Sequence, residues 1–317
     1  MPSKRTILVS FCNVEEVVFW TAIGNSRQWK GLLLHCLFAT DLHGHTDRYD
    51  KLFASIVREH PTAVFLGGDL LPRSPLAAVP SKQTDFVRDY LVPGFVSVRK
   101  ATGIEYPDIF LILGNDDPRS EEESFVAGER GGIWHYVQGK KFIWRAYSIC
   151  GLAYVPPTPF SLKDWERYDI SRYVPPGCIS PQEGRRSVPV EESQIKWGSV
   201  QKELAAISGE GPLDRAVFLL HTPPYDTPLD RAALDGKTYE HVPLDVHVGS
   251  IAVAQFIEKR QPLLTLHGHV HELARLTGKW KTRIGRTVSI NGAHDGSELA
   301  LVRFDLEFPW EATRELL

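Results

Sequence analysis

The sequence predicts an α/β fold, and three observations carry that prediction. Short apolar runs of strand length alternate along the chain with longer stretches of amphipathic helical spacing, as in βαβ units. Several of the apolar runs end in short polar loops that contain Gly, Asp, Asn or His. No internal repeat or low-complexity tract interrupts the pattern.

The first part of the pattern contains three predicted strands and two predicted helices. The strands are short, mostly apolar runs that end in polar loops. They are predicted over 32–39, 62–66 and 109–113. Apolar residues at spacings of three and four predict a helix over 47–59. A second helix is predicted within 83–100, with a bend or break at Pro93-Gly94.

The pattern is less regular between residues 117 and 200 and then returns. Further strands are predicted over 142–144, 148–155, 216–220, 263–266, 287–290 and 299–306. Further helices are predicted over 191–208 and 251–259. The returning alternation of strand and helix completes the α/β prediction.

We expect one domain over residues 31–307. Residues 1–30 are expected to form an N-terminal extension and residues 308–317 a C-terminal tail, because neither continues the pattern. A cap-like insertion is expected at about 156–190, which is rich in proline and contains aromatic residues.

The cations of this insertion allow two interpretations. Lys163, Arg167 and Arg172 could bind substrate, with Trp165 or Tyr168 stacking on a base. Alternatively, the segment is a packed arm whose cations pair with its own carboxylates, and the balanced charge of the segment favours this second interpretation. The carboxylates concerned are Asp164, Glu166 and Asp169.

Composition restricts the class of protein. The chain has 317 residues and a net charge of −3, so it lacks the basic excess that is typical of nucleic-acid binding proteins. Its four cysteines have no metal-binding spacing and are too few for a disulfide scaffold, so we expect a reducing, cytoplasmic location. No apolar stretch approaches the ~20 residues of a membrane span, and we expect no membrane partner.

Side chains that can bind metal ions follow five of the predicted strands directly. They are Asp41, His43, Asp69, Asn115, His221, His269 and His271. Ligands bind outside the carboxyl ends of the strands in open α/β sheets, so these side chains are expected to meet at one rim. A single histidine or Gly-Asp pair is common by chance, whereas the full set in this order is not.

The chemistry of the set indicates two metal ions. Imidazoles, carboxylates and one amide oxygen suit Mn, Fe, Zn, Ni or Co rather than Ca, which prefers oxygen ligands only. Seven ligands exceed what one tetrahedral ion needs and suit a pair of ions about 3.5–4 Å apart. Asp69 is the natural bridge, because each of its two oxygens can bind one ion.

Five short motifs in this chain resemble the five blocks of the calcineurin-like metallophosphoesterases, over about residues 32–307. The motifs are Asp41-Leu42-His43-Gly44, Gly68-Asp69, Gly114-Asn115-Asp116, His221-Thr222 and Gly268-His269-Val270-His271. Two longer stretches resemble a prokaryotic branch of predicted phosphoesterases. These stretches are His221-Thr222-Pro223-Pro224-Tyr225 and His247-Val248-Gly249-Ser250.

The resemblance implies two mixed β-sheets packed as a sandwich flanked by helices, with a dinuclear metal site on one rim. It implies that the first metal is held by Asp41, His43 and His271. It implies that the second metal is held by Asn115, His221 and His269, with Asp69 bridging. Two divalent ions are expected, with Mn expected first and Fe, Zn, Ni or Co as alternatives.

The predicted reaction is hydrolysis of a phosphorylated small molecule or nucleotide. Two divalent ions lower the pKa of a bridging water, so that hydroxide can attack phosphorus in line near neutral pH. Asp69 and Asn115 are therefore predicted at the reacting centre. No serine or cysteine nucleophile motif competes for the role.

The chain departs from the family pattern at Asp116. Many members have histidine directly after this asparagine, and that imidazole is the usual candidate for protonating the leaving group. A carboxylate beside two cations should have a lowered pKa and would be a poor acid. Either His45 or His247 supplies the proton instead, or the substrate has a good leaving group, which favours a phosphodiester. Asp116 could equally orient Asn115 or His221 as a supporting hydrogen-bond partner.

Other functions remain to be weighed against a phosphodiesterase. A phosphomonoesterase or a nucleotide phosphohydrolase would use the same site. A nuclease would need a basic groove, which the net charge of −3 does not favour. A non-catalytic scaffold would be expected to have lost some ligands, whereas all seven are present. A metal-dependent amide hydrolase on a barrel would begin with His-x-His rather than Asp-x-His.

Overall fold

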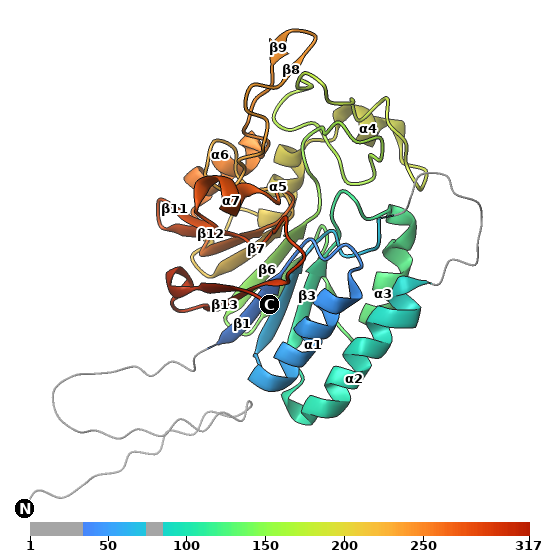
Figure 1. Ribbon diagram of the computed structural model, residues 1–317, viewed down its shortest axis with the longest axis vertical. Coiled ribbons are helices and arrows are strands. Elements are labelled where there is room, and N and C mark those ends of the chain that lie inside the picture. The colour runs from blue at the N-terminus through green and yellow to red at the C-terminus, as the bar shows by residue number, and fades with distance from the viewer. Residues whose placement is uncertain (1–33, 74–84) are drawn as a thin grey trace, which may run out of the picture. The chain divides into compact units, whose positions relative to one another are not determined.

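The computed structural model describes residues 34–73 and 85–317, so the expected N-terminal extension lies outside the described residues. The strands of the described part form two six-stranded sheets and one small hairpin. The first sheet has the order β14-β13-β1-β2-β3-β4 and the second has the order β11-β12-β10-β7-β6-β5. Figure 1 shows the two sheets side by side with helices outside them.

Both sheets are mixed. In the first sheet β1, β2, β3 and β4 are parallel, and β13 and β14 are antiparallel additions beyond β1. Its strands are β1 (His35–Ala39), β2 (Ala63–Gly67), β3 (Asp108–Ile112), β4 (His135–Tyr136), β13 (Ala300–Asp305) and β14 (Thr313–Leu316). In the second sheet β6, β7, β10 and β12 are parallel, with antiparallel β5 and β11 at the edges. Its strands are β5 (Lys141–Trp144), β6 (Tyr147–Leu152), β7 (Ala216–Leu220), β10 (Leu264–His267), β11 (Lys281–Ile284) and β12 (Thr287–Asn291).

Alternate side chains of the strands pack on opposite faces of each sheet. Phe38 and Phe65 belong to a core shared with Leu219 and Leu266, which lies between the sheets. The neighbouring side chains of the same strands pack outward against the helices. The result is a four-layer arrangement of helices, sheet, sheet and helices, as expected from the sequence resemblance.

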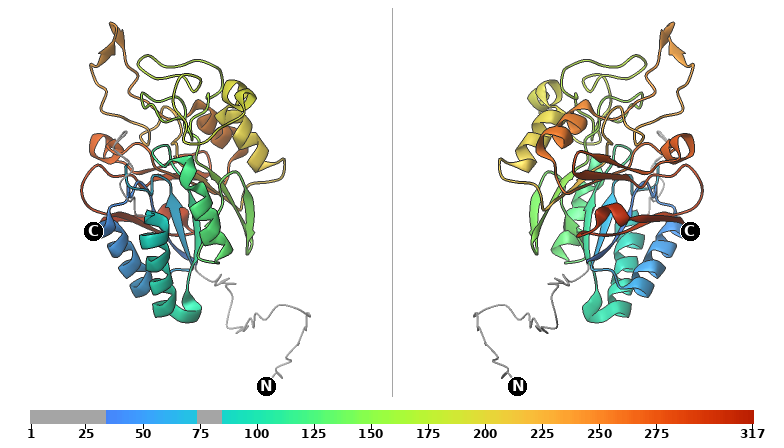
Figure 2. Two further views of the ribbon diagram at one scale, coloured as in Figure 1. Left: turned by 90° about the vertical axis from the view of Figure 1, so that its right-hand side faces the viewer. Right: turned by 90° about the vertical axis from the view of Figure 1, so that its left-hand side faces the viewer.

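The helices cover the outer faces of the sheets. They are α1 (Thr46–Glu59), α2 (Val92–Thr102), α3 (Glu122–Arg130), α4 (Glu192–Trp197), α5 (Val200–Ser208), α6 (Ile251–Arg260) and α7 (Leu273–Thr277). Figures 1 and 2 place α1, α2 and α3 along the first sheet, and α5 and α6 along the second. The β8–β9 hairpin (Thr238–Tyr239 and Val242–Pro243) projects at the upper end of both figures.

Two predicted helices differ from expectation. The helix within 83–100 is a π-helical turn (Val87–Leu91) that leads into α2, with Pro93 in the first turn of α2. The N–H of Val92 bonds to the carbonyl of Val87, so the backbone widens there instead of breaking. The single helix predicted over 191–208 is two helices, because Gly198 has extended backbone geometry and Ser199 caps α5 by accepting a hydrogen bond from the N–H of Lys202.

Residues 308–317, which we expected to form a tail, belong to the first sheet. Strand β14 pairs with β13 from Leu316 opposite Ala300 to Thr313 opposite Arg303. A short 3-10 turn (Pro309–Glu311) precedes it. The strand is short and only partly buried, so hydrophobic patterning gives it little signal.

The segment 156–190 contains no helix of its own and is held by buried polar contacts. Lys163 is fully buried and pairs with Glu166 at 2.5 Å. Arg167 is also buried, and its guanidinium lies 4.2 Å from the centroid of the Tyr154 ring. These contacts agree with the packed-arm interpretation, because neither cation is free to bind substrate.

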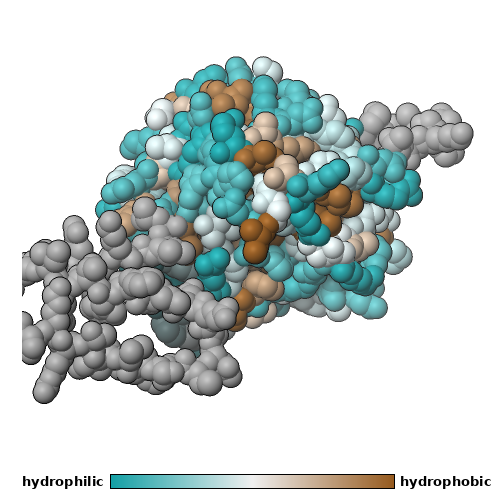
Figure 3. Space-filling view, turned by 90° about the horizontal axis from the view of Figure 1, so that it is seen from below, coloured by the Kyte–Doolittle hydropathy of each residue, from teal (hydrophilic) through white to brown (hydrophobic). Residues whose placement is uncertain are grey.

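Hydrophobic side chains are mostly enclosed. On the end seen in Figure 3, hydrophobic residues lie in small separate groups among hydrophilic ones. Within the described residues, no helix combines the length and apolar character needed to cross a membrane.

Candidate metal centre

The seven predicted ligand residues lie on loops at the carboxyl ends of five parallel strands. Asp41 and His43 follow β1, Asp69 follows β2 and Asn115 follows β3, all in the first sheet. His221 follows β7, and His269 and His271 follow β10, in the second sheet. The two sheets therefore contribute four and three of these side chains to a common rim.

The backbone at this rim is strained. Asp41, His43, Asp69 and His269 have φ angles of 55°, 47°, 52° and 72°, a left-handed region that residues other than glycine rarely adopt. Each such residue costs of order 1–3 kcal/mol, and such residues cluster at functional sites. The strain turns these four side chains toward one another.

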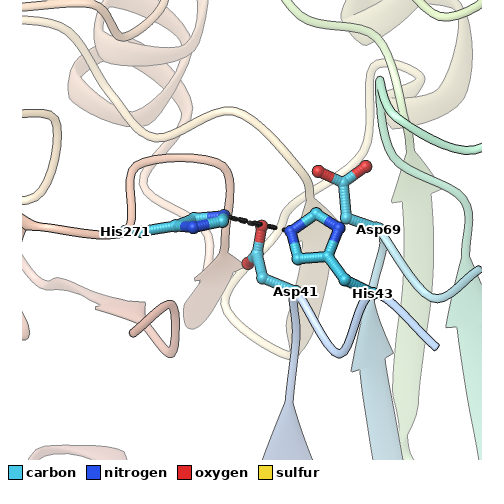
Figure 4. Close-up of side chains that lie close together, drawn as sticks. All are labelled: Asp41, His43, Asp69 and His271. Atoms are coloured by element: carbon cyan, nitrogen blue, oxygen red, sulfur yellow. Dashed lines mark hydrogen bonds and ion pairs between the residues drawn. The ribbon is translucent and has the colours of Figure 1, made fainter. Parts of the chain in front are cut away.

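A first group of atoms converges around Asp41. Its Oδ1 lies 3.1 Å from Nε2 of His271, and Nε2 of His271 lies 3.3 Å from Nε2 of His43. Together with Asp69, these residues offer four ligand atoms within 4.8 Å of one another. Figure 4 shows the four side chains, with the imidazole of His271 facing both the carboxylate of Asp41 and the imidazole of His43.

A second group of atoms converges around Asn115. Its Oδ1 lies 2.6 Å from Nδ1 of His269 and 3.1 Å from Nε2 of His221. Nδ1 of His221 lies 2.8 Å from the carbonyl of Gly67 and therefore carries a proton, which leaves the lone pair of Nε2 facing the site. Oδ2 of Asp69 lies 3.3 Å from the same Nε2. Several electron-pair donors thus face one point, as in a cation site.

Asp69 belongs to both groups. Its Oδ1 accepts a hydrogen bond of 2.8 Å from the N–H of Asp116, which fixes the carboxylate orientation. Gly114 allows this approach, because a Cβ there would lie 2.2 Å from Oδ1 of Asp69. The carboxylate is buried between the two sheets' loops.

The protein environment sets the charge of the imidazoles. Burial lowers the pKa of His43 and of His269 to about 4, so both are neutral near pH 7, which is the form that binds metal. Burial also opposes the charged form of His221, but the negative charge of Asp69 and its contact with the ring raise the pKa to about 10. In the metal-free protein a proton therefore occupies the lone pair of Nε2, and a metal ion would take the place of that proton.

Asp116 faces the site and pairs with Arg73, a residue that sequence analysis did not single out. Nε of Arg73 donates to Oδ2 of Asp116 at 3.0 Å, and Nη2 of Arg73 lies 3.2 Å from Nε2 of His43. Oδ1 of Asp116 accepts from the amide of Asn115 at 3.1 Å, which turns the amide oxygen toward the second group. Burial and the charge of Asp69 raise the pKa of Asp116, and Arg73 opposes that rise; the lowered pKa expected from the sequence was therefore wrong for the metal-free protein.

Asp117 is a second residue whose role the sequence did not indicate. Its buried carboxylate accepts hydrogen bonds from the N–H groups of Leu70 at 3.0 Å, Leu71 at 2.8 Å and Gly114 at 2.9 Å. It therefore ties the loop that carries Asp69 to the loop that carries Asn115. The only sequence signal is that Asp117 directly follows the predicted site residue Asp116.

His45, one of the two proton donors considered from the sequence, lies at the N-terminus of α1. Its carbonyl accepts from the N–H groups of Arg48 and Tyr49. Its side chain is exposed and makes no capping hydrogen bond. No contact in the described residues fixes the direction of its imidazole.

Comparison with known proteins gives one family and several similar folds. A family model described as calcineurin-like phosphoesterase matches residues 34–273. No curated protein sequence matches the chain. One solved structure is 17% identical, covers 90% of this chain and 99% of its own, and has a TM-score of 0.54.

Two further similar structures come from a bacterium and a fish. The Thermus thermophilus protein TT1561 is 19% identical over 90% of this chain and 99% of its own, with a TM-score of 0.50. A dimetal phosphatase from Danio rerio is 13% identical over 86% of this chain and 95% of its own, with a TM-score of 0.44. At such identities the likeness to the solved structures is one of fold alone.

Proposed function

The chain belongs to the calcineurin-like phosphoesterase family and is a phosphoric ester hydrolase, and we propose that it works with two divalent metal ions held by the seven rim residues. The observation that carries the proposal is the convergence of lone pairs from Asn115, His221 and Asp69 on one point. At most one of these contacts can be a hydrogen bond to Nε2 of His221, and a cation satisfies all of them. Asp41, His43 and His271 form the matching set on the other side of Asp69.

The assignment of ligands follows the two groups of atoms. Asp41, His43 and His271 would hold one ion, and Asn115, His221 and His269 the other, with Asp69 between them. Such a pair of ions, when bound, activates water and offsets charge on the phosphoryl oxygens. Manganese is the metal we expect first, and Fe, Zn, Ni or Co suit the same donors.

The residues around the ions set the geometry and the charge of the site. The low pKa of His43 and His269 keeps their lone pairs available. The contact between Asn115 and Asp116 directs the amide oxygen inward. The bond between the N–H of Asp116 and Asp69 keeps the bridging carboxylate in place.

We further propose that phosphodiesters with good leaving groups are favoured over alkyl monoesters. The support is Asp116, which stands where many family members have histidine and which accepts hydrogen bonds from Arg73 and Asn115. A carboxylate engaged as an acceptor by two donors has no proton to give. Turnover should therefore be compared across matched aryl diesters and alkyl monoesters, and a strong preference for the alkyl monoesters would contradict the proposal.

The primary test is an activity panel with Mn, Co, Ni and Zn on phosphodiesters, phosphomonoesters and nucleotides. The variant to compare with the wild type is Asp69→Asn, because it keeps the size of the side chain and removes its charge. We expect turnover by the wild type and a loss of at least ~10²-fold in the variant, since the bridging charge is lost. No turnover of any substrate would favour a scaffold, and unchanged turnover in Asp69→Asn would contradict the site assignment.

A cytoplasmic location is part of the proposal. It is supported by the free thiols of Cys36, Cys150 and Cys178, the cysteines within the described residues. Fractionation of cells that express the full chain tests it.

A further inference from the structure

Two sequence stretches outside the metal centre come together in the fold. The residues after His221 pair with the residues before α6: the N–H of Tyr225 bonds to the carbonyl of Ser250, and the N–H of Ser250 bonds to the carbonyl of Pro223. The stretches that resemble a branch of phosphoesterases, 221–225 and 247–250, are therefore neighbours.

A buried carboxylate between them orients one histidine. Oδ1 of Asp230 lies 2.8 Å from Nδ1 of His247, and Asp230 is fully buried. Backbone N–H groups of Asp226, Thr227 and Gly249 hold the same carboxylate at 3.0, 3.0 and 3.1 Å. Asp230 accepts every one of these bonds, so Nδ1 of His247 carries a proton. Nε2 is then the nitrogen that can gain or lose a proton.

The His247 side chain is accessible. It is 25% exposed, whereas its partner Asp230 is 0% exposed. A histidine that is directed by a buried carboxylate and that presents its other nitrogen outward is the arrangement used for proton transfer.

This pair lies on the same rim as the metal centre. Helix α6 joins the parallel strands β7 and β10, so its N-terminus lies at the end of the sheet where β7 delivers His221. Leu229 packs in one cluster with Val270, which lies between the ligand residues His269 and His271, and Val248 packs against this cluster.

A hydrogen-bond bridge connects the same loops. The amide of Asn291 donates to the carbonyl of Leu229 at 3.0 Å and to the carbonyl of Gly268 at 2.9 Å. The loop that holds Asp230 is thus fixed against the loop that holds His269.

We propose that His247, oriented by Asp230, donates the proton to the leaving group of the ester. The proposal rests on the proposed hydrolase function and adds the acid that Asp116 does not supply. It also separates the two histidines considered from the sequence, because His247 has an orienting carboxylate and His45 has none within residues 34–73 and 85–317. With His247 as the acid, a good leaving group is needed only in esters whose leaving group does not reach His247.

The step balances as follows. The attacking water gives one proton to solvent, and its oxygen forms a bond to phosphorus while the bond from phosphorus to the leaving oxygen breaks. The leaving oxygen takes the proton from Nε2 of His247 and departs as an alcohol. The imidazole becomes neutral, keeps the proton on Nδ1 toward Asp230, and regains a proton from solvent.

The groups that face His247 are mostly acidic. Oδ1 of Asp226 lies 3.5 Å from Nε2, and the ring centroids of Tyr225 and His247 are 6.0 Å apart. The hydroxyl of Tyr225 donates to Asp245, and Asp245 also accepts from the N–H of His247. Arg231 forms a backbone bridge with His247, but its guanidinium is turned to the carbonyl of Ala232 and to Asp235.

The test compares leaving groups in diesters that share one phosphoryl part. With His247→Gln, kcat/KM for an alkyl leaving group should fall by ~10²-fold or more, the usual contribution of a general acid. The loss should shrink steadily as the leaving group becomes a better one. His135→Gln is the matched control, because His135 also pairs with an aspartate, Asp108, but at the opposite end of the strands.

A second variant keeps the test decisive if the first one perturbs the loops. In His247→Ala, added imidazole should restore turnover of the alkyl diester, and the basic limb of its pH profile should be absent without imidazole. An equal loss for aryl and alkyl leaving groups, or no rescue in a folded, metal-binding variant, would overturn the proposal. Failure of the wild type to hydrolyse any phosphoester would instead contradict the hydrolase function itself.

Discussion

Replacing Asp117 by alanine should destabilise the protein more than most single substitutions. The carboxylate serves three buried N–H groups, those of Leu70, Leu71 and Gly114. A buried donor without a partner costs about 1–3 kcal/mol, so the total is about 3–9 kcal/mol. Stabilities of whole domains are only about 5–15 kcal/mol, so this variant approaches the limit of folding.

The Asp117→Asn variant separates the effect of the hydrogen bonds on stability from the effect of the charge. Its oxygen can still serve Leu70 and Gly114, and its amide then faces the N–H of Leu71, at a cost of about 1–3 kcal/mol. Burial and the charge of Asp69 raise the pKa of Asp117 to about 8, so most of this carboxyl is already uncharged at pH 7 and the loss of its charge in the asparagine variant costs little. The asparagine variant should therefore be much closer to the wild type than the alanine variant.

Urea unfolding at pH 7 with a chelator measures both variants without a contribution from bound metal. Binding of Mn²⁺, followed by calorimetry, should weaken by at least ~10-fold in the alanine variant, because the loops that carry Asp69 and Asn115 lose their common anchor. An alanine variant within about 1 kcal/mol of the wild type would show that water replaces the carboxylate and would refute the reasoning.

Three further predictions follow from contacts around the site and on the surface. Gly268→Ala should weaken Mn²⁺ binding while the chain stays folded, because the new Cβ would lie 2.4 Å from Oδ2 of Asp41; unchanged binding in calorimetry would contradict this. Glu59→Gln should reduce the free energy of unfolding by about 1 kcal/mol at pH 7 but not near pH 2. The hydrogen bond from Arg303 lowers the pKa of Glu59 to about 2, so the stabilisation by this pair is lost as the pH falls from about 4 toward 2. Urea titrations that give the same difference at every pH would refute this prediction. Mn²⁺ at ~100 times its Kd should stabilise the wild type by about 2.7 kcal/mol per site, and the gain in Tm should be smaller in Asp69→Asn; equal gains would place the metal elsewhere.

The strands that precede the proposed ligand residues could be predicted from the sequence. These strands are short apolar runs that end in polar loops, and the predicted run over 216–220 coincides with β7. The edge strands β4, β11 and β14 were not predicted, because they have two to four residues and most of their side chains are only partly buried or exposed. Local pattern carries little information for a strand that is stabilised mainly by pairing with its neighbour.

The supporting contacts of the site lay beyond the reach of local pattern. Arg73 meets Asp116 across 43 positions of sequence, and Asp117 meets Leu71 across 46. His247 was considered from the sequence, but its partner Asp230 was not, because nothing in the intervening residues indicates that the chain returns. Ligand type can be inferred from residue identity, whereas orientation by a distant partner requires the fold.

The division of the proposed ligands between the sheets has a consequence for synthesis of the chain. The strand order places β13, near the end of the chain, beside β1, near its beginning. A nascent chain that has emerged only as far as β7 carries Asp41, Asp69 and Asn115 but lacks the histidines after β10, and its first sheet still lacks β13. Such a chain has an incomplete donor set, so loading of the proposed metal ions would come late, after both sheets have assembled, and would report that the whole domain has been made.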